Sequence, residues 1–286
     1  MKKILFVIVF CCLYVKTLFA EETVNDLVDA VYVINLDRNP ERFDYVKKQF
    51  DEIGLKIQRF SAVDGKKLTL VDKKTGERFT NKDAADADFY IKNKNKEFQV
   101  VCESRKAELR DSEFTYFPDN RLTFGELGCF MSHRAIYADM LKNGYSKVII
   151  LEDDVKIFKN FKEDVCNILK NIPTNADLVF LDLHIKKFSM KYLLDRVFSF
   201  NMPYLFKVRY STNICGTHAY VVTNKGAKKL LGRTSFSNLP IDVCICFDRV
   251  LYFYVAKSKL CTAGEIGSVI GEYGNRLLFL DLFGLK

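Results

Sequence analysis

The sequence predicts an α/β fold, in which a central sheet is flanked by helices. Three observations support this. A strand–helix–strand pattern spans residues 30–62, an almost wholly apolar strand covers residues 146–151, and hydrophobic residues make up 49% of the chain. The 286 residues can form one large domain or two small ones, and no internal repeat divides them.

The opening unit has a distinct pattern for each of its three elements. Residues 30–36 read AVYVINL, a short run rich in β-branched residues that predicts a buried strand. Asn39 suits the N-cap of a helix over residues 41–53, where apolar residues recur at helical spacing. Residues 56–62 then predict a second strand, and a strand–helix–strand unit of this length is typical of α/β folds.

A charged segment, residues 66–120, interrupts this pattern. Its acidic and basic residues are mixed and show little periodicity, which is typical of a solvated surface. We expect an insertion with a helix near residues 83–92 and loop elsewhere.

Regular patterns return at residue 123. Thr123 and Glu126 form a capping box that predicts a helix to about Lys142. The apolar strand 146–151 follows and should lie in the sheet centre. The later predictions are helices at 161–169, 224–231 (capped by Asn224) and from 240, with strands at 177–183, 204–210, 215–222 and 250–255.

The N-terminus has the three parts of a secretory signal peptide. Lysines at positions 2 and 3 precede an apolar run, and residues 17–20 precede two glutamates. Leu18 stands where a smaller residue is usual, so an uncleaved signal anchor is the alternative. We therefore expect a leader over residues 1–20, followed by residence in the secretory pathway or membrane association through the N-terminus.

The net charge of +8 constrains the class of partner. The basic residues are too dispersed to form the stripe that nucleic acid requires. A modest positive excess instead suits an anionic small molecule or a membrane surface.

The acidic run Glu152-Asp153-Asp154 directly follows the apolar strand. Three adjacent carboxylates repel one another unless a cation offsets their charge, and carboxylate oxygens suit Mg²⁺ or Mn²⁺. Ligands of open α/β sheets bind at the carboxyl ends of strands. The alternative is an acidic turn that caps the next helix.

Three weaker features could also contribute to a site. The polar and basic groups after the first strand could hold a ribose and phosphates, or could form an ordinary surface loop. Cys129 and His133 lie four residues apart on one helix face, but two ligands do not make a metal site. Asp242 stands at a helix start, where an acid is usually a cap.

Taken in order, these motifs resemble glycosyltransferase family 25, which includes bacterial lipooligosaccharide galactosyltransferases and animal collagen galactosyltransferases. The resemblance covers about residues 30–260. It departs from the family at the long charged segment and at His218, where the family commonly has Gly. The blocks that carry it are residues 33–38 with Glu41-Arg42, 62–65, 122–129 with Ser132-His133, 150–155, 216–222 with Gly226-Ala227, and 240–242.

The resemblance implies a GT-A-like, Rossmann-type mixed sheet flanked by helices, in a single glycosyltransferase domain over residues 21–286. It implies transfer of a hexose, most often galactose, from a UDP-sugar to a glycan or glycoconjugate, as in lipopolysaccharide biosynthesis. Mn²⁺, or Mg²⁺, would be the cofactor, held by Glu152 and Asp154. For an inverting reaction, Asp242 is the first candidate base and Asp248 the second.

The remaining site residues follow from the same resemblance. Asp153 would face away from the ion, because side chains alternate along a strand, and would contact the nucleotide or a backbone amide. The substrate-binding candidates are Asn35, Asp37, Arg38, Arg42, Asp64, Ser132, His133 and Asp153.

Two other functions stay open at this point. An exported, non-catalytic relative could keep the fold and bind a carbohydrate or nucleotide. A metal-dependent hydrolase could use the same carboxylates.

Overall fold

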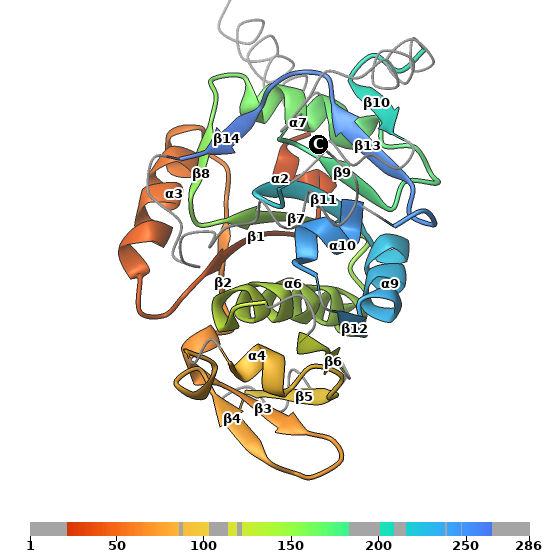
Figure 1. Cartoon of the computed structure of the whole chain (residues 1–286). Helices are drawn as coiled ribbons and strands as arrows, with labels where there is room; N and C mark the ends of the chain where they lie inside the picture. The colour runs from red at the N-terminus through yellow and green to blue at the C-terminus, as the bar shows by residue number, and fades with distance from the viewer. Residues whose placement is uncertain are drawn as a thin grey trace, which may run out of the picture.

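The computed structural model describes residues 22–85, 88–102, 114–118, 122–182, 201–208, 216–237, 239–246 and 248–264. Its centre is a seven-stranded mixed sheet with strand order β10-β13-β9-β11-β7-β1-β2 (Figure 1), as the α/β prediction requires. The strands are β1 (Ala30–Asn35), β2 (Gln58–Ser61), β7 (Lys147–Glu152), β9 (Leu178–Phe180), β10 (Leu205–Val208), β11 (Ala219–Thr223) and β13 (Phe253–Ala256).

The strand directions give the sheet two different edges. β1 is parallel to β2 and β7, and β9 is parallel to β13. β11 runs antiparallel to both β7 and β9. The carboxyl ends of β1, β7, β9 and β13 therefore meet along one border of the sheet, which the ends of the strands form, together with the start of β11. We call this the carboxyl edge and the opposite one the amino edge.

Side chains of the central strands alternate between two cores. In β7, Val148 and Ile150 pack with α6 (Phe124–Asn143) on one face. Ile149 and Leu151 pack on the other face with α3 (Pro40–Glu52) and α7 (Phe161–Lys170). Both faces of β7 are buried, as its unbroken apolar sequence predicts.

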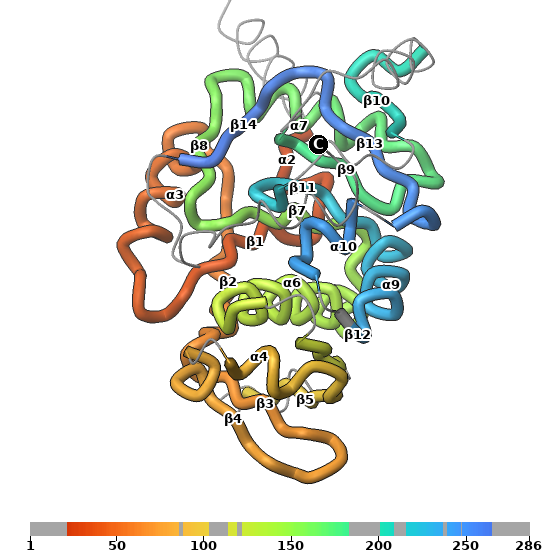
Figure 2. Tube along the Cα trace, in the orientation of Figure 1, coloured from red at the N-terminus to blue at the C-terminus, as the bar shows by residue number. Residues whose placement is uncertain are grey.

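The helix α6 lies between the large sheet and a second, smaller sheet (Figure 2). Its capping box is formed as predicted, and it ends at Gly144, whose φ of 67° is left-handed. The loop after β2 approaches the start of α6 so closely that a Cβ on Gly65 would lie 2.0 Å from the carbonyl oxygen of Phe124. Only glycine fits at such a contact.

The described part of the charged segment contains four strands and short helical turns, so the expectation of loop with one helix is wrong. These four strands join β12, which comes from later in the chain, in the order β12-β6-β5-β3-β4. In β3, buried and half-buried residues alternate along LTLVD, a strand period that the surrounding charges conceal in the sequence. The strands are β3 (Leu68–Asp72), β4 (Arg78–Thr80), β5 (Phe98–Cys102), β6 (Thr115–Tyr116) and β12 (Phe236–Ser237).

Only short helical turns occur where the helix near 83–92 was expected. These are η2 (Asp83–Ala85) and α4 (Phe89–Lys92); a further short helix, η1 (Gly65–Lys67), precedes β3. The edge strand β12 comes from far along the chain and pairs in parallel with β6. The second sheet is thus completed by residues that follow most of the central sheet in sequence.

The other elements differ from prediction mainly at their ends. Thr223, not Asn224, caps α9 (Asn224–Arg233), because its hydroxyl accepts the Gly226 backbone N–H at 3.1 Å. Asn39 precedes α3 but makes no side-chain cap. The last predicted strand begins at Phe253, and the remaining elements are α2 (Val24–Leu27), β8 (Val155–Ile157), α10 (Ile241–Cys246) and β14 (Cys261–Ala263).

The predicted leader, residues 1–20, lies outside the described residues. Within the part that is described, no helix combines the length and apolar character needed to cross a bilayer.

Candidate functional site

Glu152 ends β7 at the carboxyl edge and faces α6. It continues the alternation of Val148 and Ile150, so its side chain meets His133 of α6. The Nε2 of His133 lies 3.5 Å from Oε1 of Glu152. The hydroxyl of Thr217, just before β11, donates to the same oxygen at 2.6 Å. The carboxylate is thus held from two sides.

Asp154 and His218 join Glu152 in a second contact. β11 begins at the carboxyl edge, so the preceding His218 arrives beside the end of β7. Its Nδ1 lies 3.5 Å from Oε2 of Glu152 and 3.5 Å from Oδ1 of Asp154. Candidate ligand atoms of these three residues all lie within 4.8 Å of one another.

Asp153 points away from this cluster. Its two oxygens accept hydrogen bonds from Asn35 Nδ2 at 2.7 Å and from Arg42 Nε at 2.8 Å. Arg42 also lies 3.8 Å from Oδ2 of Asp154 and is only 5% exposed. In this arrangement Arg42 offsets part of the charge of the acidic run from inside the protein.

Burial and neighbours shift three pKa values in this cluster. Burial raises the pKa of Glu152, but contacts with His133 and His218 outweigh it and hold the pKa well below its usual range. Burial raises the pKa of Asp153 despite Asn35 and Arg42. Burial lowers the pKa of His218, but Asp154 and Glu152 raise it more, to about 11. Without a metal, His218 is therefore an imidazolium at neutral pH.

The loop after β1 forms its own polar network at the same edge. Asp37 accepts from Arg59 at 2.7 Å and from Ser61 at 2.8 Å. Arg38 donates through Nε to Asp64 at 3.1 Å. Asn35 connects this loop to the acidic run, since its Oδ1 accepts from Arg59 at 2.8 Å while its Nδ2 donates to Asp153.

Ser132, predicted to bind substrate, is wholly buried. Its hydroxyl accepts from the Val63 backbone N–H at 2.8 Å and donates to the Gly128 carbonyl at 2.7 Å. In the structure Ser132 thus anchors the loop after β2 to α6. Two sequence blocks that are distant along the chain are in contact here.

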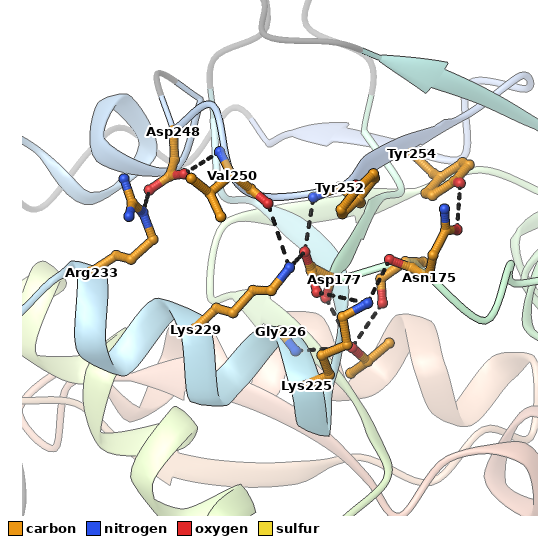
Figure 3. Close-up of polar contacts among 12 residues, drawn as sticks. Asn175, Asp177, Lys225, Gly226, Lys229, Arg233, Asp248, Val250, Tyr252 and Tyr254 are labelled. Atoms are coloured by element: carbon orange, nitrogen blue, oxygen red, sulfur yellow. Dashed lines mark hydrogen bonds and ion pairs between the residues drawn. The ribbon is translucent and has the colours of Figure 1, made fainter.

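The two candidate bases lie in different places. Asp242, at the start of α10, is near Cys129: burial raises the pKa of the Cys129 thiol, and the charges of Glu152 and Asp242 add to that effect. Asp248 instead pairs with Arg233 and accepts the Val250 backbone N–H at 2.8 Å (Figure 3). Its neighbour Val250 accepts a hydrogen bond from Lys229 of α9 at the amino edge, so the structure does not bring Asp248 to the acidic run.

Thr217 and His218 were not predicted as site residues. Both precede a strand that runs antiparallel to β7, a pairing that no spacing in the sequence reveals. One feature of the sequence could have identified His218: it stands at a position where the resembled family commonly has glycine.

The cluster of Glu152, Asp154 and His218 is suited to a divalent cation. Two carboxylates and an imidazole are a donor set for Mn²⁺ and similar ions. Oδ1 of Asp154 is buried and accepts no hydrogen bond from the described residues; the imidazolium of His218 faces it at 3.5 Å, and a bound cation would take over that role once His218 gives up its proton. The position at the carboxyl edge is where ligands of α/β sheets bind.

Comparison with known proteins identifies the family. The model of glycosyltransferase family 25 (LPS biosynthesis protein) matches residues 28–245. A glycosyltransferase 25 family member of Drosophila melanogaster is 29% identical, over 78% of this chain and 31% of its own length. Human procollagen galactosyltransferase 2 is 25% identical, over 75% and 29%. A probable inactive glycosyltransferase 25 family member 3 of Bos taurus is 25% identical, over 77% and 32%.

The chain spans about a third of the length of these relatives. The family match, by contrast, covers most of the chain and includes the acidic run, the loop after β1 and the start of α10. The protein whose carboxyl edge is described above therefore belongs to glycosyltransferase family 25.

Proposed function

We propose that the chain is an active, metal-dependent glycosyltransferase that moves a hexose from a nucleotide sugar to a glycan or glycoconjugate. The observation that carries this proposal is the cluster of Glu152, Asp154 and His218 at the carboxyl edge. Galactose is the sugar we favour, because one relative is named a procollagen galactosyltransferase.

In this proposal Glu152, Asp154 and His218 hold Mn²⁺ in preference to Mg²⁺. Carboxylates suit both ions, but an imidazole ligand favours the transition metal. When bound, the ion would supply positive charge against the diphosphate of the donor as the nucleotide departs. His218 would have to release its proton to ligate the ion.

The chain's own residues would position the donor around that ion. Asp153, held by Asn35 and Arg42, keeps the acidic run in place. Arg38 is 36% exposed at the same edge and is the cation we assign to the donor phosphates, while Asp37 and Asp64 orient the surrounding loop.

Asp242 is the proposed base for an inverting transfer. Its charge and that of Glu152 both act on the thiol of Cys129 in α6, and α10 packs against α6. A base there could take the proton of the acceptor hydroxyl as it attacks the sugar carbon from the face opposite the leaving nucleotide.

A non-catalytic relative is the second candidate, because a bovine relative of similar identity is named probably inactive. Such a protein could bind a nucleotide sugar without turning it over. The complete cluster of two carboxylates and a histidine favours the active enzyme.

Calorimetric titration with UDP, with and without Mn²⁺, tests the metal site. We expect binding to be at least tenfold tighter with Mn²⁺, and this gain to disappear in Asp154→Ala. Asp51→Ala, which removes an exposed carboxylate of α3, is the matched control and should keep the gain. Equal UDP affinity with and without Mn²⁺ would exclude the proposed metal site.

A second measurement separates the two candidates. We expect Mn²⁺-dependent release of UDP from UDP-galactose when a glycan acceptor is present, and its loss in Asp242→Asn. Tight, Mn²⁺-dependent donor binding with no turnover across a panel of nucleotide sugars and acceptors would favour the non-catalytic relative.

A further inference from the structure

Glu152 also belongs to a second cluster, on the side opposite His218. Candidate ligand atoms of Cys129, His133 and Glu152 all lie within 4.8 Å of one another. Cys129 and His133 share one face of α6, and Glu152 is the third residue that their spacing alone could not identify. We propose that these three residues form a separate binding site for a thiophilic divalent cation such as Zn²⁺.

The ring of His133 is held in the orientation that a metal ligand needs. Its Nδ1 lies 2.8 Å from the hydroxyl of Tyr220, and that hydroxyl lies 2.7 Å from the hydroxyl of Tyr137. Tyr220 can accept from Nδ1–H and donate to Tyr137, which leaves the lone pair on Nε2. Histidine ligands of metals are typically oriented by such a contact to the second ring nitrogen.

The other ring nitrogen faces the cluster without a hydrogen bond. His133 is fully buried, and among the described residues its Nε2 has no hydrogen-bond partner. Oε1 of Glu152 lies 3.5 Å from Nε2. In the tautomer that donates from Nδ1 to Tyr220, the Nε2 lone pair and the carboxylate oxygen of Glu152 face each other, and a cation between them would stabilise that arrangement.

The spacing suits tetrahedral coordination. Bonds of about 2.3 Å to sulfur and about 2.0 Å to nitrogen and oxygen place the ligand atoms of a tetrahedral zinc site roughly 3.5 Å apart. His133 and Glu152 already have this separation. The Sγ of Cys129 lies within 4.8 Å of both other ligand atoms, the thiol would lose its proton on binding, and the fourth position can be water.

The donor set distinguishes this site from the proposed Mn²⁺ site. A thiolate selects Zn²⁺, Co²⁺ or Cd²⁺ over Mg²⁺ and Mn²⁺. Oε1 of Glu152 faces His133, whereas Oε2 faces His218. Because both clusters share one carboxylate, Zn²⁺ bound at Cys129 would reduce the negative charge available to the other cluster and weaken Mn²⁺ binding there.

Titration of the metal-free protein with Co²⁺ tests the site by absorption. We expect an intense near-ultraviolet band from thiolate-to-cobalt charge transfer, and its loss in Cys129→Ser. Cys166→Ser is the matched control and should keep the band, since Cys166 lies on α7 and contacts the backbone of Glu22. Absence of the band in the wild-type protein, or its persistence in Cys129→Ser, would overturn the proposal.

Two further measurements keep the zinc site testable if Cys129→Ser does not fold or if the proposed transferase function is wrong. In the wild-type protein, Zn²⁺ should protect Cys129 from alkylation, as read by peptide mass spectrometry, and equal alkylation with and without Zn²⁺ would refute the site. Asp154→Asn should keep the cobalt band, because Asp154 belongs only to the other cluster. The zinc site therefore does not depend on the glycosyl transfer proposed above.

Discussion

The two edges of the central sheet both bury carboxylates, but they neutralise them differently. At the amino edge, Asp177 precedes β9 and is 0% exposed. Its Oδ2 accepts from Lys229 Nζ at 2.6 Å and from the Tyr252 backbone N–H at 2.9 Å, and Lys225 lies 3.7 Å from Oδ1 (Figure 3). Two cations of the chain itself therefore surround one anion.

At the carboxyl edge, the carboxylates outnumber the cations of the chain that face them. Three adjacent carboxylates share one arginine, Arg42, and otherwise face the imidazoles of His133 and His218. With His218 counted as an imidazolium, three carboxylates face two cations here, whereas the single carboxylate of Asp177 faces two lysines. This difference supports the cation site proposed above, whereas the contacts of the amino edge contribute to stability.

Removing one charge at the carboxyl edge should give the largest difference between the effect on sugar transfer and the effect on stability. We expect Asp154→Asn to lower Mn²⁺-dependent sugar transfer by about 100- to 1,000-fold, because a metal ligand is lost. The free energy of unfolding should change by less than about 1 kcal/mol, because removing a charge also relieves carboxylate repulsion. Transfer assays paired with urea unfolding measure both; a large loss of stability with retained transfer would reverse the assignment of the two edges.

The opposite result is expected at the amino edge. Asp177→Asn should lower the free energy of unfolding by about 2–3 kcal/mol, because two lysines lose their buried partner, although Lys229 is partly exposed and can rehydrate. Sugar transfer below the melting transition should not change. Lys225→Met is the matched control and should cost less than about 1 kcal/mol, since it leaves the shorter Lys229 contact in place.

A pH dependence sharpens the comparison further. His218 has a pKa raised to about 11 from an ordinary value of 6.5, so its protonation stabilises the metal-free fold fully below pH 6.5 and progressively less as pH rises toward 11. The stability difference between wild type and His218→Gln should therefore shrink across this window, by up to about 1 kcal/mol per pH unit. Urea unfolding in chelator at pH 6.5 and 9.5 checks this; a constant difference would contradict it.

The smallest expected effect concerns the cap of α9, which presents Lys225 and Lys229 to Asp177. Thr223→Ala removes the hydroxyl that accepts the Gly226 backbone N–H, and should cost about 1 kcal/mol in unfolding free energy. Thr223→Ser should restore most of that loss. Sugar transfer should be unaffected by either change, as judged at a temperature where both variants are folded.

Local patterns in the sequence predicted much of the central sheet. The apolar runs of β1 and β7 and the capping box of α6 are signals carried by adjacent residues, and each element formed as expected. The small sheet was missed because the alternation in β3 and β5 is short and lies among charged residues. Short strands of this kind are stabilised by their partners more than by their own composition.

The candidate site was predictable only in part, for a different physical reason. The acidic run and the polar groups after β1 stand at strand ends, so topology alone brings them to one edge. His218 and Thr217 reach that edge through the antiparallel pairing of β11 with β7, which depends on the whole sheet. The lysines around Asp177 likewise come from α9, which is distant in sequence.

The pairing of β12 with β6 has a consequence for biosynthesis. Thr115 emerges from the ribosome long before its partner Phe236, so the small sheet has an unpaired edge while most of the chain is still being made. That edge closes only after the strands and the helix α9 that precede β12 have been synthesised. Completion of the small sheet is thus a late folding event, and a ribosome-stalled chain that ends before residue 236 should be more exposed to proteases and chaperones than the finished chain.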